Sequence, residues 1–352
     1  MQSICIDKVA VPAWNPAVHV SDDVGEDESL RNFLKTAPLA YETPEIVFSD
    51  LGTTVVTGSA FTVKSEKMGV VQDSFYLIPQ LSWEQTLRVD ATVSRYDGDM
   101  PALVIGNMAS DNYYHWNFQC LASLLLFRQF APWKEFVTVM PALNSWQSQT
   151  LSTIDFEGER FELDKTDIFF CGKGFRSNLT GGEFAFAPHV LVTSQFEEIA
   201  QAVDVPSERG RKIYASRLDA GSTRRILNED AVCELMASYG FEIITPGKLT
   251  VEEQITTFRD ADVIVGAHGA GMTNLLFSQA SKGPRVVELF QSHYVNACYA
   301  RICQAKGLDY TAVVSPGGLL LDENEPRPTS VSVNDLVCLA DLGVIESVIA
   351  KL

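Results

Sequence analysis

Long apolar runs and basic clusters are both missing from this sequence of 352 residues. The apolar run Leu124 to Phe127 falls far short of the roughly 20 residues that a transmembrane helix needs. The N-terminus, MQSICIDKVAVPAW, has neither the basic start nor the apolar stretch of a signal peptide. Lys and Arg number 27 against 45 Asp and Glu, and this net charge of −18 argues against a nucleic-acid partner. We therefore expect no transmembrane segment and a protein that is cytoplasmic, either free or peripheral to the inner membrane.

Patterned cysteines and histidines are missing as well. The seven cysteines are scattered and none is spaced C-x-x-C, so the sequence predicts neither a disulfide framework nor a zinc site. The five histidines are also too scattered to indicate a metal cluster. The length predicts two domains, since a domain usually has roughly 100 to 200 residues.

From residue 210 onwards, strand-like and helix-like segments alternate strictly. This alternation predicts an open parallel sheet with helices on both faces, and hence the α/β class. The first half is less regular, with one clear strand, loop and helix unit and a stretch, RFELDKTDIFF, that suggests a hairpin or crossing strands. We predict an N-terminal domain over 1–205, a linker at 202–210, a C-terminal domain over 206–330 and a helical tail over 331–352. The segments that carry this prediction are strands at 102–106, 135–140, 212–217, 241–247, 262–266, 285–290 and 309–314, and helices at 115–130, 144–153, 228–240, 250–261 and 293–307.

A glycine-rich turn, VIVGAHGAGMTNLLF, occupies residues 263–277 between a strand and a predicted helix. Gly266, Gly269 and Gly271 would let the chain turn sharply and a ligand approach the backbone, while the start of the helix would attract a phosphate. The alternative is a tight turn with a capping His268 and no ligand. A third possibility is NAD, although G-x-x-G-x-G departs from the dinucleotide fingerprint G-x-G-x-x-G.

Four charged residues are expected at the same edge of the sheet. Arg217 follows a strand, and Arg224 and Arg225 precede a helix, so that their guanidinium groups could bind a diphosphate, or could simply be solvated. Glu288 ends the next strand, where an acidic side chain can accept hydrogen bonds from ribose hydroxyls.

These residues resemble those of glycosyltransferase family 61. The resemblance covers about 205–292, through KIYASRLDAGSTRRILNED, YGFEIITPGKLTVEEQITTFRDADVIVGAHGAGMTNLLF and VVELF, and a local stretch around 107–130, through NYYHWNFQCLASLLLF. Members of this family include plant arabinosyl- and xylosyltransferases, animal enzymes that add O-linked N-acetylglucosamine, and bacterial proteins of capsular polysaccharide biosynthesis. The resemblance implies a GT-B-like architecture, in which two Rossmann-like domains face each other across a cleft, and inversion at the anomeric carbon.

The resemblance also implies a UDP-sugar donor, held mainly by the C-terminal domain, and a glycan acceptor. Inversion needs a base on the N-terminal side, and we predict His115 for this role, with Asp111 as the alternative. The alternative interpretation of His115 is a residue that caps the helix or lies at the edge of the core. The residues predicted to bind the donor are Arg217, Arg224, Arg225, His268, Gly269, Ala270, Gly271, Thr273, Asn274 and Glu288.

The sequence departs from secreted members of the family, since it shows neither a membrane anchor nor a disulfide pattern. We therefore expect a bacterial enzyme of surface polysaccharide synthesis. Asp97 and Asp99 have the D-x-D spacing that binds a metal in another glycosyltransferase fold, but Gly98 between them favours a turn. We expect no cofactor and no divalent metal. A homo-oligomer is compatible with the sequence, and a non-catalytic nucleotide-sugar-binding protein is the alternative to an enzyme.

Overall fold

The computed structural model describes residues 2–205, 210–218, 224–318, 332 and 336–352, which form two compact units. Unit 1 comprises Met1–Val9 and Glu42–Gln195, and unit 2 comprises Ala10–Tyr41 and Phe196–Leu352. Both contain sheets with parallel strands and helices, which confirms the α/β class. Among the helices of these described ranges, none is long and apolar enough to span a membrane.

Unit 2 is built on a 6-stranded parallel sheet in the order β14-β13-β15-β16-β17-β3. The neighbouring strands are in register, so that Gly266 of β15 lies between Ala215 of β13 and Glu288 of β16. The parallel sheet predicted from residue 210 onwards is therefore confirmed. Its strands are β3 (Ala17–Val20), β13 (Arg211–Ala215), β14 (Glu242–Ile244), β15 (Ala261–Ala267), β16 (Arg285–Gln291) and β17 (Asp309–Ser315).

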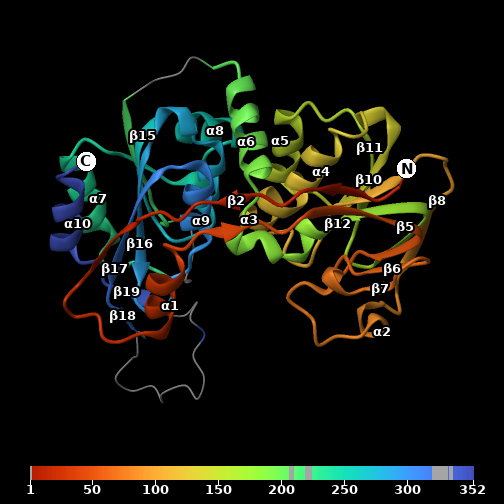
Figure 1. Ribbon diagram of the computed structural model, residues 1–352, viewed down its shortest axis with the longest axis horizontal. Helices are drawn as coiled ribbons and strands as arrows, with labels where there is room; N and C mark the ends of the chain where they lie inside the picture. The colour runs from red at the N-terminus through yellow and green to blue at the C-terminus, as the bar shows by residue number, and fades with distance from the viewer. Residues whose placement is uncertain (1, 206–209, 219–223, 319–331, 333–335) are drawn as a thin grey trace. The chain divides into compact units, whose positions relative to one another are not determined.

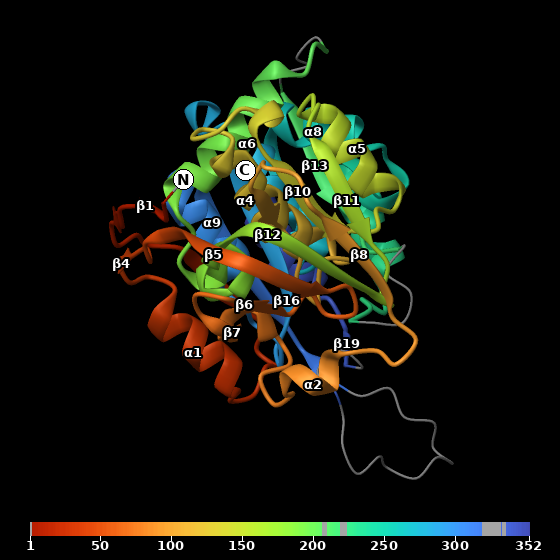
Figure 2. The same ribbon diagram turned by 90° about the vertical axis from the view of Figure 1, so that its right-hand side faces the viewer.

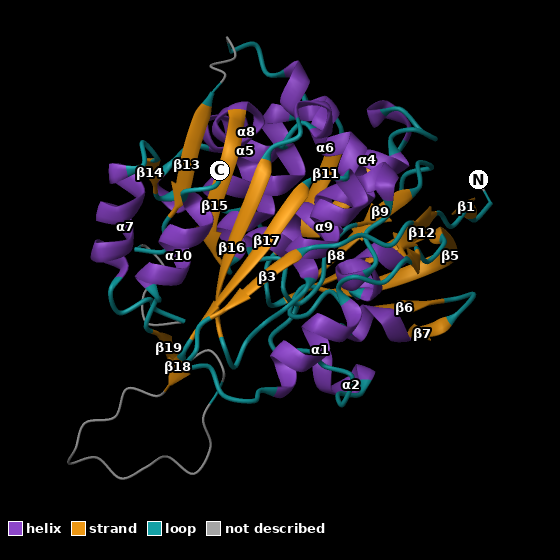
Figure 3. Ribbon diagram, turned by 60° about the vertical axis from the view of Figure 1, so that its left-hand side comes forward, coloured by secondary structure: helices purple, strands orange, loops and turns teal. Residues whose placement is uncertain are grey.

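Helices cover both faces of this sheet. Figure 1 shows α7 and α10 on one side of the strands and α8 and α9 on the other. Val232 and Met236 of α7 and Ile345 and Val348 of α10 pack with strand residues such as Val265 in one apolar core. Figure 3 shows the strands of this unit side by side next to these helices. The remaining elements of unit 2 are α1 (Glu28–Thr36), α7 (Glu229–Ser238), η6 (Pro246–Lys248), α8 (Val251–Asp260), η7 (Ala270–Phe277), η8 (Ala280–Lys282), α9 (Cys298–Lys306), β18 (Gly317–Gly318), β19 (Val337–Cys338) and α10 (Leu342–Ile349).

Local signals explain where several of these helices begin. Helix α8 starts at the predicted capping box, in which the Glu253 N–H donates to Thr250 Oγ1 over 3.2 Å and the Thr250 N–H donates to Glu253 Oε2 over 2.7 Å. Helix α7 follows Asn228 as predicted, but the Asn228 side chain donates to the carbonyl oxygen of Ala340 instead of capping the helix. Among the described residues of the tail, the helix begins at Leu342, where Asp341 caps it.

The division of the chain differs from the predicted one in two places. Residues 10–41 belong to unit 2, because β3 extends its sheet by pairing Ala17 with Thr311 of β17. The tail is part of the same unit, since α10 contributes to its core. The change of unit falls at Phe196, within α6 (Val190–Ala202), and the linker predicted over 202–210 lies partly outside the described residues.

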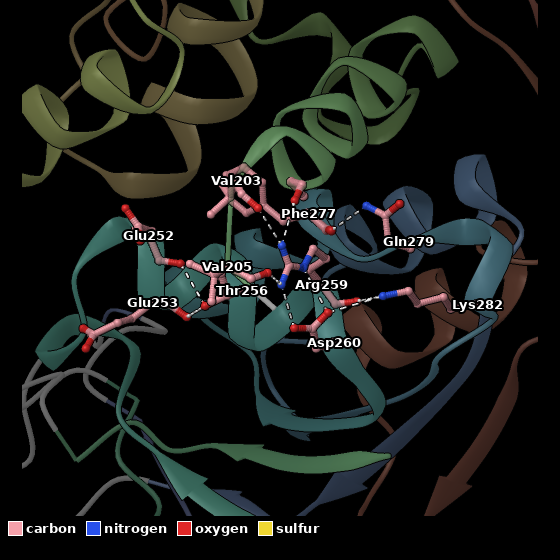
Figure 4. A network of polar contacts seen from close by, with 11 residues as sticks. Val203, Val205, Glu252, Glu253, Thr256, Arg259, Asp260, Phe277, Gln279 and Lys282 are labelled. Carbon is pink, nitrogen blue, oxygen red and sulfur yellow. Dashed lines mark hydrogen bonds and ion pairs between the residues drawn. The ribbon is translucent and has the colours of Figure 1, made fainter. Parts of the chain in front are cut away.

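A buried arginine holds the chain that follows α6 (Figure 4). Arg259, at the end of α8, donates to the carbonyl oxygens of Val203 at 3.1 Å and Val205 at 2.9 Å. The same guanidinium contacts both carboxylate oxygens of Asp260, at 2.9 and 2.8 Å, and Lys282 donates to Asp260 at 3.3 Å. The buried charges thus compensate one another while they fix this segment to α8.

Unit 1 contains a 9-stranded mixed sheet, whose main path runs β11-β10-β9-β12-β5-β6-β7. The pairs β11–β10, β10–β9 and β9–β12 are parallel. On its other side, β12 pairs antiparallel with β5. Figure 2 shows β5 and β12 as long neighbouring strands. Because β9 and β10 separate β11 from β12, the stretch RFELDKTDIFF forms separate strands and not a hairpin. The strands are β1 (Ile4–Ile6), β5 (Ile46–Thr57), β6 (Val63–Ser65), β7 (Gly69–Val71), β8 (Thr92–Tyr96), β9 (Ala102–Val104), β10 (Val137–Pro141), β11 (Glu159–Leu163) and β12 (Asp167–Ser177), and a separate two-stranded sheet joins β2 (Ala10–Val11) to β4 (Tyr41–Glu42).

The helix predicted at 115–130 is a composite of three segments. It begins with α3 (Tyr113–His115), continues as the π-helix η2 (Trp116–Leu121) and ends as α4 (Ala122–Phe127). Its cap is Asn112, whose side chain accepts from the Tyr114 N–H, so His115 is not the capping residue. The other helical segments of unit 1 are η1 (Gln72–Phe75), α2 (Trp83–Thr86), η3 (Trp133–Glu135), α5 (Ser145–Thr153), η4 (Asn178–Gly181) and η5 (Glu183–Phe186).

Candidate active site

The glycine-rich turn lies at the carboxyl edge of the unit 2 sheet, as predicted. Strand β15 ends at Ala267, and η7 begins at Ala270. The helix after the turn is a 3-10 helix of 8 residues and not the expected α-helix. Its N-cap, Gly269, has an extended backbone with φ 172° and ψ 175°. Ala270 and Gly271 are half-buried, so the start of η7 is open to a ligand.

The glycines of the turn lie close to neighbouring protein atoms. A Cβ atom on Gly269 would overlap the guanidinium group of Arg217, whose Nη1 donates to the carbonyl oxygen of His268 over 3.1 Å. A Cβ atom on Gly271 would lie 3.1 Å from Cγ of Pro246. Gly269 allows Arg217 to lie directly against the turn. The predicted space for an approaching ligand stays a prediction.

Thr273 and Asn274 do not face a ligand. Both are fully buried inside η7. The Asn274 side-chain amide donates to Gln254 over 2.9 Å and to the carbonyl oxygen of Gly271 over 3.0 Å, and the Thr273 hydroxyl lies 3.4 Å from that of Tyr299. Burial and these contacts argue against the predicted donor contacts of both side chains, which shape the turn.

His268 is held by a buried carboxylate. Its Nδ1 lies 2.5 Å from Oε1 of Glu288, and the Tyr310 hydroxyl donates to Oε2 of Glu288 over 2.6 Å. Burial raises the pKa of Tyr310 well above its usual value, and Glu288 acts in the same direction, so the hydroxyl keeps its proton. Glu288 is fully buried. Its predicted contact with ribose hydroxyls is therefore wrong, and its carboxylate orients the imidazole of His268.

A small pocket of about 20 Å³ lies beside His268, where three adjacent parallel strands end. We call it the strand-end pocket. The His268 ring stacks on Phe290, with ring centroids 5.1 Å apart, and meets Tyr294 edge-on at 5.2 Å. The Arg224 guanidinium lies 4.9 Å from the centroid of the Tyr294 ring, and its buried Nε has no hydrogen-bond partner among the described residues. The pocket is lined by these side chains and by the carboxyl ends of β15, β16 and β17.

The three predicted arginines have different surroundings. Arg217 is half-buried beside the turn, and its backbone N–H donates to the buried carboxylate of Glu229 over 2.7 Å. Arg224 lines the strand-end pocket, whereas Arg225 is exposed and does not line it. Two of the three predicted arginines thus lie at the turn or the pocket, beside Glu229 and Tyr294, which were not predicted. Tyr294 could have been found, since it closely follows the end of a parallel strand.

Unit 1 has its own pocket at the ends of parallel strands. This cavity of about 410 Å³ lies beyond the carboxyl ends of β9, β10 and β11, and Asn107, Ser110 and Asp111 line it. Asp111 is exposed and lies 3.4 Å from Nζ of Lys165, which lines the cavity from the opposite strand end. An exposed carboxylate beside a polar cavity is compatible with the predicted role of Asp111.

His115 lies four residues after Asp111, in a more enclosed place. Its Nδ1 is 3.2 Å from Oε1 of Gln119 and 3.5 Å from the Tyr76 hydroxyl. The rings of Tyr76 and Tyr114 pack against it, with centroid distances of 5.5 and 5.3 Å. Burial lowers the pKa of His115, and the hydrogen bond to Gln119 opposes this only in part. The imidazole is therefore neutral at neutral pH, as a base must be.

The D-x-D stretch is a turn on the surface. Asp97 and Asp99 follow β8 and precede β9, and Asp97 pairs with Arg95 over 2.6 Å. Both partners are mostly exposed. Within the described part of the chain, no three His, Cys, Asp or Glu side chains are grouped as metal ligands.

A Gly-rich turn at the edge of a parallel sheet, with arginines beside it, is typical of proteins that bind a phosphorylated ligand. The family model described as Glycosyltransferase 61 matches residues 113–287, which include the π-helix of unit 1 and the turn of unit 2. Residues 113–287 thus resemble glycosyltransferase family 61, in agreement with the resemblance seen in the sequence.

Several characterised relatives match shorter stretches. A beta-1,2-xylosyltransferase of Oryza sativa subsp. japonica is 36% identical over 69 residues, which are 20% of this chain and 13% of that protein. An EGF domain-specific O-linked N-acetylglucosamine transferase of Drosophila melanogaster is 31% identical over 108 residues, 30% of this chain and 20% of that protein. A beta-1,2-xylosyltransferase of Arabidopsis thaliana is 29% identical over 83 residues, 24% of this chain and 14% of that protein. The matches span at most a fifth of each relative's length.

Proposed function

We propose that the chain is an inverting glycosyltransferase that moves a sugar from a UDP-sugar to a hydroxyl group of a glycan or a related acceptor. The strand-end pocket is the observation that carries this proposal, because Arg224 and His268 meet there beside the ends of three parallel strands. A guanidinium group with a free Nε suits the oxygens of a diphosphate. Arg217 lies on the turn next to it. The match of residues 113–287 to the model of family 61 supports the same proposal.

In the proposed reaction, the acceptor oxygen forms a bond to the anomeric carbon while the bond from that carbon to the phosphate oxygen breaks. The electron pair of the broken bond leaves on UDP, and Arg217 and Arg224 offset the charge that develops there. The proton of the acceptor hydroxyl passes to a base, for which we propose His115, with Asp111 as the alternative. No divalent metal takes part in this scheme.

The proposal extends to architecture and context. We propose a GT-B-like enzyme in which unit 2 holds the donor and unit 1 provides the base and the acceptor site. Support comes from the occurrence, in each unit, of a pocket at the carboxyl ends of parallel strands. We further propose a role in bacterial surface polysaccharide synthesis, in the cytoplasm or at the inner membrane. All seven cysteines are free thiols, which suits a reducing compartment.

Donor binding is tested by thermal unfolding with UDP, GDP and NAD at equal concentrations. A ligand that binds only the folded chain stabilises it by about 2.7 kcal/mol at 100 times its Kd, so UDP should raise the Tm and the other two should not. The variant Arg224→Met should lose most of the shift with UDP. Its neighbour Arg225 is exposed, and Arg225→Met is the matched control that should keep the shift. Stabilisation by NAD alone would favour a dinucleotide-dependent oxidoreductase instead.

Catalysis is tested separately from binding. Release of UDP from a pool of UDP-sugars in the presence of glycan acceptors would distinguish a transferase from a protein that only binds nucleotide sugars. His115→Ala should lower kcat by about 10²- to 10⁴-fold, the usual contribution of a positioned base, while its affinity for UDP stays close to that of the unmodified protein. If Asp111→Asn shows this loss and His115→Ala does not, the base is Asp111.

A further inference from the structure

The surroundings of His115 determine which of its ring nitrogens carries the proton. A neutral imidazole has one N–H donor and one acceptor nitrogen, and only the acceptor can take a proton from a substrate. The tautomer can be deduced when a chain of hydrogen bonds leads from the ring to a group that can only donate or can only accept a hydrogen bond. Unit 1 contains such a chain, through Gln119 and Asn107.

The chain begins at a backbone carbonyl. The carbonyl oxygen of Thr180 can only accept, so the atom of Asn107 that lies 3.1 Å from it must be the side-chain NH₂ group. The Ala109 N–H, which can only donate, lies 2.9 Å from the other side-chain atom of Asn107 and identifies it as the oxygen. Two independent backbone groups thus fix the orientation of the Asn107 amide.

The orientation of Asn107 fixes that of Gln119. The Asn107 NH₂ group lies 2.7 Å from one terminal atom of Gln119, which must therefore be the carbonyl oxygen Oε1. The same oxygen lies 3.2 Å from Nδ1 of His115. An oxygen that already accepts from Asn107 can only accept from the imidazole, so the proton of the neutral ring is on Nδ1.

The π-helix η2 contributes to this geometry. Gln119 lies within it, and His115 immediately precedes it, four residues earlier, a spacing at which two side chains lie on the same face of a helix. Gln119 and Asn107 are almost fully buried, which holds both amides in place. The Gln119 NH₂ group has no hydrogen-bond partner among the described residues, so the amide stays in this orientation although one of its polar groups is unsatisfied.

We propose that Gln119 is a positioning residue that, together with Asn107, holds His115 as the Nδ1–H tautomer and leaves Nε2 as the proton acceptor. No described residue forms a hydrogen bond with Nε2. The role of Nε2 as the atom that takes the proton of the sugar-accepting hydroxyl rests on the proposed function. The tautomer of the ring does not. Burial, which lowers the pKa of His115, keeps the ring neutral and Nε2 unprotonated at neutral pH.

The tautomer is measurable without substrate. In the full chain labelled with ¹⁵N-histidine, the chemical shifts of the ring nitrogens report which of them is protonated, and the His115→Gln variant assigns the signal among the five histidines. We expect a neutral ring with a protonated Nδ1 and an unprotonated Nε2 at pH about 7.5. An Nε2–H tautomer, or rapid exchange between the two, would overturn the proposal.

A second measurement uses Gln119→Glu, which places a carboxylate at Nδ1 and should raise the pKa of His115 in an NMR titration. The tyrosines Tyr76 and Tyr114, the titratable groups whose rings contact the imidazole, are unchanged in this variant. Gln129→Glu is the matched control, since it adds the same charge just after α4 at an exposed position and should leave this pKa unaltered. A pKa that Gln119→Glu does not move would contradict the contact.

The outcomes separate the two proposals. Gln119→Leu should lose the tautomer preference and lower kcat, with KM and the affinity for UDP unchanged. If the NMR result is as expected but His115→Ala has normal turnover, the hydrogen-bond chain stands and the role of His115 as base is wrong. If His115→Ala loses turnover but the ring is the Nε2–H tautomer, the proposed base stands and the role of Gln119 is wrong.

Discussion

Gly269→Ala should remove Arg217 from the donor site and leave the fold intact. The new methyl group would occupy the position of the Arg217 guanidinium, and this long side chain can swing away from the turn. Alanine is tolerated by the backbone, because Gly269 is extended, with φ 172°. The substitution therefore acts on Arg217 and not on the path of the chain.

The expected magnitude follows from the contact that is lost. A hydrogen bond to a charged group contributes about 1.5 to 3 kcal/mol, so the Kd for UDP should rise roughly 10- to 150-fold. Arg217→Ala should cause a similar loss. Because both substitutions remove one interaction, the double variant should bind UDP about as weakly as either single variant.

Gly271→Ala is the matched control. Its methyl group would lie 3.1 Å from Cγ of Pro246, which needs a shift of only a fraction of an ångström, and it does not touch Arg217. Affinity for UDP is measured by isothermal titration calorimetry, and folding is checked by urea unfolding. Unchanged affinity in folded Gly269→Ala, or losses that add up in the double variant, would refute this reasoning.

Three further predictions concern stability, pH and metals. Arg259→Met should lower the free energy of unfolding in urea by about 1.5 to 3 kcal/mol, since the buried Asp260 carboxylate loses the guanidinium but keeps Lys282; a loss below about 1 kcal/mol would contradict this. Burial lowers the pKa of both His115 and His189, so the unfolded chain takes up protons first and the urea midpoint should fall as the pH drops below about 6.5. Replacing both histidines by Gln should flatten this dependence. The rate of sugar transfer should stay the same in EDTA and in the variant Asp97→Ala. A rate that EDTA abolishes and manganese restores would show that a metal takes part.

The sequence was sufficient for features that depend on neighbouring residues. The capping box of Thr250 and Glu253 is visible because its two members lie three residues apart, and it begins α8 as predicted. The strict alternation of strands and helices likewise gave the parallel sheet of unit 2. The position of Arg217 after a strand was enough to place it near the Gly-rich turn.

Features that depend on distant partners were missed. A glycine indicates that something approaches the backbone closely, but not whether it is a ligand or, as at Gly269, an arginine of the same chain. Glu288 shows the same limit. Glu288 lies in the middle of an apolar strand, where a buried carboxylate must be paired. Its partners, however, are His268, which follows β15, and Tyr310 of β17. Its burial could have been predicted, but not the residues that it holds.

The strand β3 has a consequence for how the protein is made. Ala17 pairs with Thr311, so 294 residues (311 − 17) separate the two partners along the chain. At translation speeds of about 5 to 20 residues per second, the N-terminal strand waits roughly 15 to 60 seconds for its partner to be synthesised. During this time the alternating segment Ala17–Val20 has no sheet to join. Unit 2 thus folds only once nearly the entire chain has been synthesised, and a fragment that begins at Phe196 would expose β17 as an unpaired edge.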